Sequence, residues 1–186
     1  MNYDFFVSKD IFSGLYILLI VAFFIFLSEI LFNYFNVKSF ITRKFVHFST
    51  GVLLIFSPYI FHAKLIPIIL SILFTIINFL LIEFNLFKSI HFSKNKNYGT
   101  LFYPIAYFIL CVFWWEKSFV FQLSLAILTI SDTSASLVGN ILPNSKKFTI
   151  WRDKKTINGT IAMAITSFLL VYLGQFFLKD LNQKLI

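Results

Sequence analysis

One carboxylate stands inside an apolar stretch of this sequence. The segment Leu128–Asn140 reads LTISDTSASLVGN, so Asp132 is surrounded by hydroxyls and small side chains. An aspartate at the centre of a membrane helix costs at least about 2.5 kcal/mol on insertion scales, so such groups normally face a protein interior or a wet cavity. Asp132 is therefore the first candidate for chemistry in the chain, as a ligand of a divalent cation or as a catalytic group.

The spacing around Asp132 places polar and small residues on one side of a helix. Thr129, Asp132, Ser136 and Gly139 follow one another at intervals of three or four residues, which brings them to the same face. The alternative for the small residues is close helix packing, which small side chains permit in membranes. Packing alone does not require a carboxylate, so this alternative does not explain Asp132.

Further polar residues are expected at the same depth as Asp132, near the ends of other apolar segments. We predict that they line one inward-opening polar pocket. The candidates are Glu29, Asn33, His47, Asn78 and Glu83, and Ser136 and Asn140 are possible supporting residues. Glu29 is equally suited to be a structural partner of Arg43, and Glu83 has the same ambiguity.

Basic residues gather just before two expected helix starts. Lys154 and Lys155 precede the segment Thr156–Thr160, and Arg43 stands four residues before His47, on one helix face. Helix N-termini and cations together favour a polyanion, and Mg²⁺ typically joins one or two carboxylates to substrate phosphates. The alternatives are topogenic loop lysines, an interfacial arginine and a hydrogen-bonded histidine.

The composition identifies the environment of these residues. Only 13% of the residues are charged while 59% are hydrophobic, against about 25% charged in an ordinary soluble domain. We expect an all-α, polytopic integral membrane protein forming one domain over residues 1–186. Six apolar runs predict six membrane helices, at Phe12–Phe35, Phe45–Phe61, Leu65–Phe84, Leu101–Trp115, Phe119–Leu142 and Gly159–Leu178. The single Cys111 provides no disulfide framework or cysteine metal site.

The distribution of lysine and arginine predicts the orientation. The connections after the first, third and fifth runs hold eleven of the sixteen basic residues, and the other side holds five. Cytoplasmic loops carry the excess of positive charge, so we expect the N-terminus outside and these three connections in the cytoplasm. The first run lacks a basic leader and a small-residue cleavage site, which predicts a retained helix. The expected location is a bacterial inner (plasma) membrane.

Five short motifs resemble those of one family, the polyprenol kinase group that includes dolichol kinases, phytol kinases and CTP-dependent diacylglycerol kinases. The motifs are RKFVH, IEF, YGTLFYP, SDTSASLVGN and KKTINGT, in this order between Arg43 and Ile165, so the family-like core covers about residues 43–165. Two positions depart from the family pattern: Ser131 stands where glycine is usual, and Asn158 stands where glutamate is frequent.

The resemblance implies transfer of the γ-phosphate of CTP to the hydroxyl of a lipid alcohol, with Mg²⁺ as the cofactor. Asp132 would be the metal ligand or catalytic acid, with His47 as a second catalytic candidate, and the implied partners are CTP, a membrane lipid and the bilayer, without nucleic acid. The residues expected to bind the nucleotide are Arg43, Lys44, Gly139, Lys147, Lys154, Lys155, Thr156, Gly159 and Thr160.

Two alternatives stay open at this point. A phosphatidate cytidylyltransferase would also combine CTP, Mg²⁺ and a lipid, although its usual pair of acidic residues after a glycine-rich stretch is absent here. A non-enzymatic lipid or ion carrier would place the buried carboxylates on a transport path, although the chain shows none of the duplicated halves common in transporters.

Overall fold

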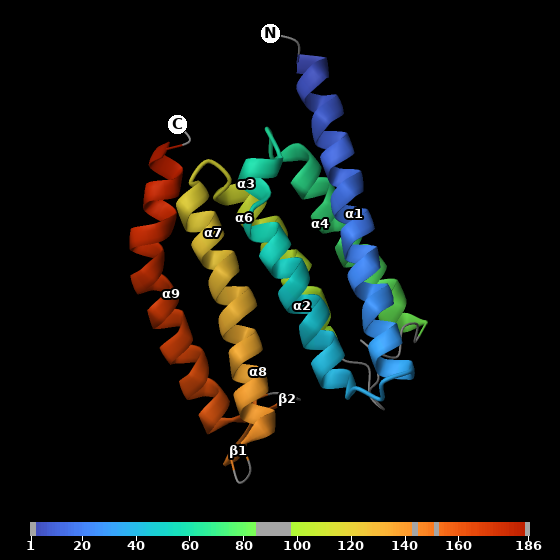
Figure 1. The fold of residues 1–186 in the computed structure, drawn as a ribbon, viewed down its shortest axis with the longest axis vertical. Coiled ribbons are helices and arrows are strands. Elements are labelled where there is room, and N and C mark those ends of the chain that lie inside the picture. Colours follow the sequence, from blue (N-terminus) through green and yellow to red (C-terminus); the bar gives the residue numbers. More distant parts are fainter. Residues whose placement is uncertain (1–2, 85–97, 143–144, 151–152, 185–186) are drawn as a thin grey trace.

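The computed structural model of the chain describes residues 3–84, 98–142, 145–150 and 153–184, and it is mostly helical (Figure 1). Its elements are α1 (Tyr3–Asn33), α2 (Ser39–Ile55), α3 (Ser57–Ile60), α4 (Leu65–Glu83), the 3₁₀ turn η1 (Tyr98–Leu101), α6 (Phe102–Phe113), α7 (Ser118–Ala126), the π-helical turn η2 (Ile127–Ser131), α8 (Asp132–Ile141), β1 (Lys147–Ile150), β2 (Asp153–Thr156) and α9 (Ile157–Lys184). The predicted all-α class is confirmed, with one small hairpin added.

The helices lie side by side and alternate in direction (Figure 1). The α1–α2 connection, the end of α8, the β-hairpin and the start of α9 lie together at one end of the bundle, which we call the hairpin end. Both chain termini lie toward the opposite end. Two of the three lysine-rich connections therefore share one end, while most of the third lies outside the described residues.

Four helical segments are long and apolar enough to cross a membrane. They are Val7–Asn33, Leu65–Glu83, Ser118–Ile141 and Ile157–Phe176. Each of these segments begins and ends within a few residues of a predicted run, except that the first begins five residues before its run. Large apolar side chains on them are exposed, for example Phe23 and Phe168, as expected where helices meet acyl chains. These features are compatible with a membrane protein.

The other two predicted runs form shorter helices. The run at 45–61 is divided between α2 and α3, because Pro58 lies in the first turn of α3 and cannot continue the i to i−4 hydrogen bonds of α2. The run at 101–115 contains α6, which has 12 residues and belongs to the shorter apolar helix Gly99–Phe113. About 20 residues are needed to cross the hydrocarbon core without tilt or thinning, so these two fall short of that length.

The core lies where α2, α6 and α7 meet. Tyr107 is fully buried, its hydroxyl lies 2.8 Å from Ser57 Oγ, and its ring packs against Phe121. Trp115 contacts the same Phe121 ring edge-on. This cluster extends to Ile17 on α1, so burial of apolar side chains links the first helix to the rest of the bundle.

A buried carboxylate fixes the N-terminal part of α1. Asp10 is only 3% exposed, and its oxygens accept hydrogen bonds from the backbone N–H groups of His62 and Ala63 at 3.0 to 3.1 Å. His62 Nδ1 lies 2.8 Å from the same carboxylate. Asp10 thus satisfies backbone donors at the turn before α4, which explains how an acidic side chain is accommodated there.

Candidate functional site

Asp132 meets two basic side chains of α2. Its carboxylate forms an ion pair with the Lys44 ammonium, and His47 Nε2 lies 3.6 Å from the same oxygen. Lys44 and His47 are mostly buried, with side chains 15% and 18% exposed, whereas the Asp132 side chain is 38% exposed. The carboxylate is therefore neutralised by α2 on one side and open to a ligand on another.

A π-helical turn immediately precedes Asp132. In η2 the backbone hydrogen bonds join residues i and i+5 instead of i and i+4. Some carbonyl groups of this turn therefore lack the N–H partner that they would have in an α-helix. His47 Nε2 lies 3.4 Å from the Leu128 carbonyl, and the hydroxyls of Thr133 and Ser134 donate to the carbonyls of Thr129 and Ile130 at 2.6 and 2.8 Å. The hydroxyl-rich sequence around Asp132 thus stabilises the irregular turn that carries it.

Tyr103 and Gly51 hold this turn against α2 and α6. The Tyr103 hydroxyl lies 2.9 Å from Thr129 Oγ1, and its ring packs edge-to-face on His47 at 4.5 Å between centroids. A Cβ on Gly51 would overlap the Thr129 side chain and lie 2.7 Å from the Tyr103 hydroxyl. Neither residue was assigned a role from the sequence; the available signal was the position of Gly51 one helical turn after His47.

The helix face predicted from the sequence does not line a single pocket. Its residues are Thr129, Asp132, Ser136 and Gly139. Thr129 is buried against α6, Asp132 contacts α2, and Gly139 packs against Thr156. Part of the difference arises in η2, because a π-turn shifts the phase of the helix between Thr129 and the residues after it. A uniform helical period does not describe this segment.

Thr156 and Gly159 have structural contacts at the start of α9. Thr156 Oγ1 accepts a hydrogen bond from the Gly159 backbone N–H at 3.2 Å, as an N-cap residue does, and the Ile157 N–H donates to the Lys146 carbonyl at 3.0 Å. A Cβ on Gly159 would lie 2.7 Å from the Ala135 carbonyl oxygen of α8. These groups therefore close the α8–α9 contact, whatever else they bind.

The expected loop before α9 is a two-stranded antiparallel hairpin. Lys147 pairs with Thr156, Lys155 with Phe148, and Lys154 with Thr149. Because successive side chains of a strand point to opposite faces, Lys147 shares a face with Thr156 and Lys155 lies on the other face. The Thr160 hydroxyl turns back to the Thr156 carbonyl at 3.1 Å. The expected nucleotide-binding residues of this region therefore do not all point the same way.

The supporting residues predicted from the sequence mostly contact their own helices. Asn33 donates to Glu29 at 2.9 Å, the Asn78 amide donates to the Phe74 carbonyl at 2.8 Å, and the Asn140 amide donates to the Ser136 carbonyl at 2.6 Å. The supporting candidates Glu83 and Ser136 are half-buried, as is Arg43, which was expected to bind the nucleotide. The contacts described for these side chains do not join them to Asp132.

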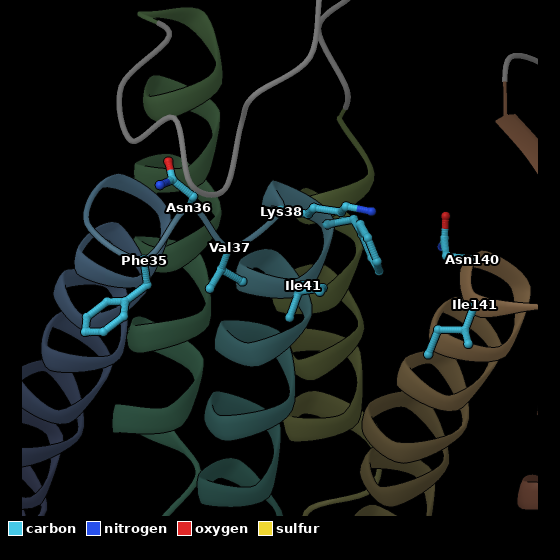
Figure 2. Close-up of a pocket in the computed structure, with 8 residues that line it drawn as sticks. Phe35, Asn36, Val37, Lys38, Ile41, Asn140 and Ile141 are labelled. Carbon is cyan, nitrogen blue, oxygen red and sulfur yellow. The ribbon is translucent and has the colours of Figure 1, made fainter.

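A cavity of about 720 Å³ opens at the hairpin end, between the α1–α2 connection and the end of α8 (Figure 2). Its lining residues are Phe35, Asn36, Val37, Lys38, Phe40, Ile41, Asn140 and Ile141. Asp132 is absent from this lining, and Asn140 lies about 12 Å further along α8, at 1.5 Å per residue. The described lining mixes polar and apolar groups and holds none of the residues expected in the predicted polar pocket; of the supporting candidates it contains Asn140.

Whether Mg²⁺ suits the site depends on the side chains that could serve as its ligands. Over residues 3–84, 98–142, 145–150 and 153–184, no three His, Cys, Asp or Glu side chains are grouped as metal ligands. Asp132 alone would supply one carboxylate. This donor set fits an Mg²⁺ ion that arrives with phosphate ligands, because Mg²⁺ commonly takes one carboxylate together with substrate phosphates and water.

Comparison of the chain with protein-family models, with curated proteins and with solved structures finds no match. The contacts around Asp132 are therefore the basis for a functional proposal.

Proposed function

We propose that the chain is a membrane-embedded lipid kinase, which transfers the γ-phosphate of CTP to the hydroxyl of a polyprenol, phytol or diacylglycerol at the cytoplasmic face. The observation that carries this proposal is the convergence of Lys44 and His47 on Asp132. Two of the motifs that resemble the polyprenol kinase group, RKFVH and SDTSASLVGN, supply these three side chains.

The proposed topology has six crossings with the N-terminus outside. The four long apolar helices would be completed by α2 with α3 and by α6, and the hairpin end would face the cytoplasm of a bacterial cell. The excess of lysine and arginine in the α1–α2 and α8–α9 connections supports this orientation. Asp132 would then lie in the inner leaflet, where a water-soluble nucleotide and a membrane lipid can meet.

In the proposed reaction the lipid hydroxyl oxygen forms a bond to the γ-phosphorus while the bond to the β–γ bridging oxygen breaks. The products are a lipid phosphate and CDP, and the hydroxyl proton leaves to a nearby base or to water. Asp132 would either hold Mg²⁺ or orient the hydroxyl, and Lys44 would neutralise phosphate charge. When bound, Mg²⁺ would neutralise the phosphate oxygens during in-line transfer.

His47 would position Asp132 in this reaction. Its Nε2 lies near both the Leu128 carbonyl and the Asp132 carboxylate, and the Tyr103 ring limits its rotation. An Nε2–H tautomer would donate toward these oxygens. The polyanion would approach from the hairpin end, where Lys147, Lys154 and Lys155 lie on the hairpin.

The decisive assay uses CTP labelled separately at the α and γ positions, with purified protein, Mg²⁺ and a lipid extract. A kinase transfers only the γ label to lipid and releases CDP. A cytidylyltransferase transfers the α label and releases pyrophosphate. Absence of both labels from the lipid, in a preparation that is folded and binds CTP, would contradict the proposal and favour a carrier.

A further inference from the structure

The cavity at the hairpin end is lined by apolar and polar groups in about equal measure. Phe35 and Ile41 contribute apolar surface, Lys38 contributes a cation, and Asn36 and Asn140 contribute amides, while no acidic residue is part of the described lining. Its volume of about 720 Å³ lies within the range of about 300 to 1,000 Å³ that is common for sites of small organic ligands. The lining therefore suits a neutral aromatic group attached to an anion.

The cavity and the Asp132 site lie along one seam between α2 and α8. The two helices touch at Lys44 and Asp132, and the cavity opens between the same helices nearer the hairpin end (Figure 2). Asn140 is about 12 Å along α8 from Asp132, at 1.5 Å per residue. This separation is comparable to the extended length of a nucleoside triphosphate from its base to its γ-phosphate.

We propose that this cavity binds the nucleoside of the triphosphate substrate, with the phosphates directed along the seam toward Lys44 and Asp132. The inference rests on the proposed function, which it deepens by naming the base-binding part of the site. Charge supports the direction, because Lys38, just before α2, and Lys44 on α2 provide cations along the path of the phosphates. The apolar side chains in the lining, such as Phe35 and Ile41, suit the faces of a base, which stack readily on aromatic and apolar side chains.

Asn140 provides a polar contact for the edge of the base. Its amide nitrogen donates to the Ser136 carbonyl at 2.6 Å, and its amide oxygen points away from the helix (Figure 2). A carbonyl oxygen held in this way can accept a hydrogen bond from an exocyclic amino group. Cytosine carries such a group and uracil does not, so the arrangement favours CTP over UTP.

The test compares the binding of CTP with that of inorganic tripolyphosphate, by calorimetry on the purified full chain in detergent. Ile41→Trp fills the cavity, so we expect it to weaken CTP binding at least about tenfold and to change tripolyphosphate binding by less than about twofold. Ile161→Trp is the matched control, because Ile161 is an exposed apolar residue on α9 outside the cavity lining. It should leave both affinities unchanged.

A second pair of variants tests the charge. Lys38 and Lys64 both occupy N-cap positions, of α2 and α4, and neither makes a side-chain cap hydrogen bond. Lys38→Ala should weaken CTP binding about three- to tenfold, as expected for loss of one phosphate contact, and Lys64→Ala should leave it unchanged. Equal effects of the two substitutions would overturn the inference.

The remaining outcomes separate this inference from the proposed function. If the wild-type chain transfers the γ label and Ile41→Trp binds CTP as tightly as wild type, the cavity is not the nucleoside site and only the inference fails. The inference also fails if Ile41→Trp weakens the binding of CTP and of tripolyphosphate equally. It fails as well if the wild-type chain binds tripolyphosphate as tightly as CTP. Failure of wild type to bind either ligand would overturn the inference and the proposed kinase together.

Discussion

Lys44 on α2 and Asp132 on α8 form an ion pair, although 88 residues separate them in the chain. The pair joins two helices at the point where a π-turn ends and α8 begins. Since the Asp132 side chain is 38% exposed, solvent and ions weaken the interaction compared with a fully buried pair. The carboxylate can therefore exchange its partner for a ligand at modest cost.

A double-mutant cycle should measure this modest coupling. Lys44→Met and Asp132→Asn are each expected to change the unfolding free energy slightly, with a coupling of about 0.5 to 1 kcal/mol between them. Thermal or denaturant unfolding in detergent, followed by circular dichroism, provides the measurement. Strict additivity of the two substitutions would show that the ion pair contributes no stability and would contradict this prediction.

Asp10 should behave as a structural carboxylate. Asp10→Ala leaves the N–H groups of His62 and Ala63 without their acceptor, so we expect a loss of about 2 to 3 kcal/mol of stability. The turnover of the remaining folded protein should be unchanged, because Asp10 lies toward the end of the bundle away from the hairpin. Activity corrected for the folded fraction checks this, and a specific loss of turnover would contradict the assignment.

Thr156 should stabilise α9 through its hydroxyl. Thr156→Ser keeps the cap to the Gly159 N–H, whereas Thr156→Ala removes it and should cost about 1 kcal/mol. If capping is its main role, CTP affinity should follow the folded fraction in both variants. A large loss of CTP affinity in a stably folded Thr156→Ala protein would instead assign this hydroxyl to the nucleotide.

Thiol labelling should reveal the orientation in the membrane. In a Cys111→Ser background, a cysteine replacing Lys147 on the hairpin should resist an impermeant thiol reagent in intact cells. A cysteine replacing Lys64, at the turn before α4, should react. Both should react after the cells are opened. The reverse pattern in intact cells would place the hairpin end outside and would remove access of cytoplasmic CTP to the site.

The sequence predicted the long helices well, because an apolar run long enough to cross a membrane has few other ways to satisfy its backbone. Leu65–Glu83 differs from its predicted run by one residue at its end, and Ser118–Ile141 differs by one residue at each end. The division between α2 and α3 was missed although Pro58 signals it. Whether α2 with α3 and α6 cross the membrane is still a prediction.

The local geometry of the site was harder to predict. The π-turn before Asp132 depends on contacts from His47 and Tyr103, which lie on other helices and have no local signature. The hairpin escaped notice because its strands have four residues each and include several lysines. Lys44 was expected near the nucleotide, but its direct pairing with Asp132 follows from how α2 and α8 meet and not from spacing within either segment.

The central claim is that Asp132 supports γ-phosphate transfer from CTP to a lipid. Asp132→Asn keeps the shape of the side chain and removes its charge, so the protein should still insert and fold while transfer falls at least about a hundredfold. The direct measurement is the amount of label from γ-labelled CTP recovered in lipid, for wild type and Asp132→Asn at equal folded concentration. Loss of lipid label in the variant with only a slight change in thermal stability is the expected result, and near-normal transfer by Asp132→Asn would contradict the account.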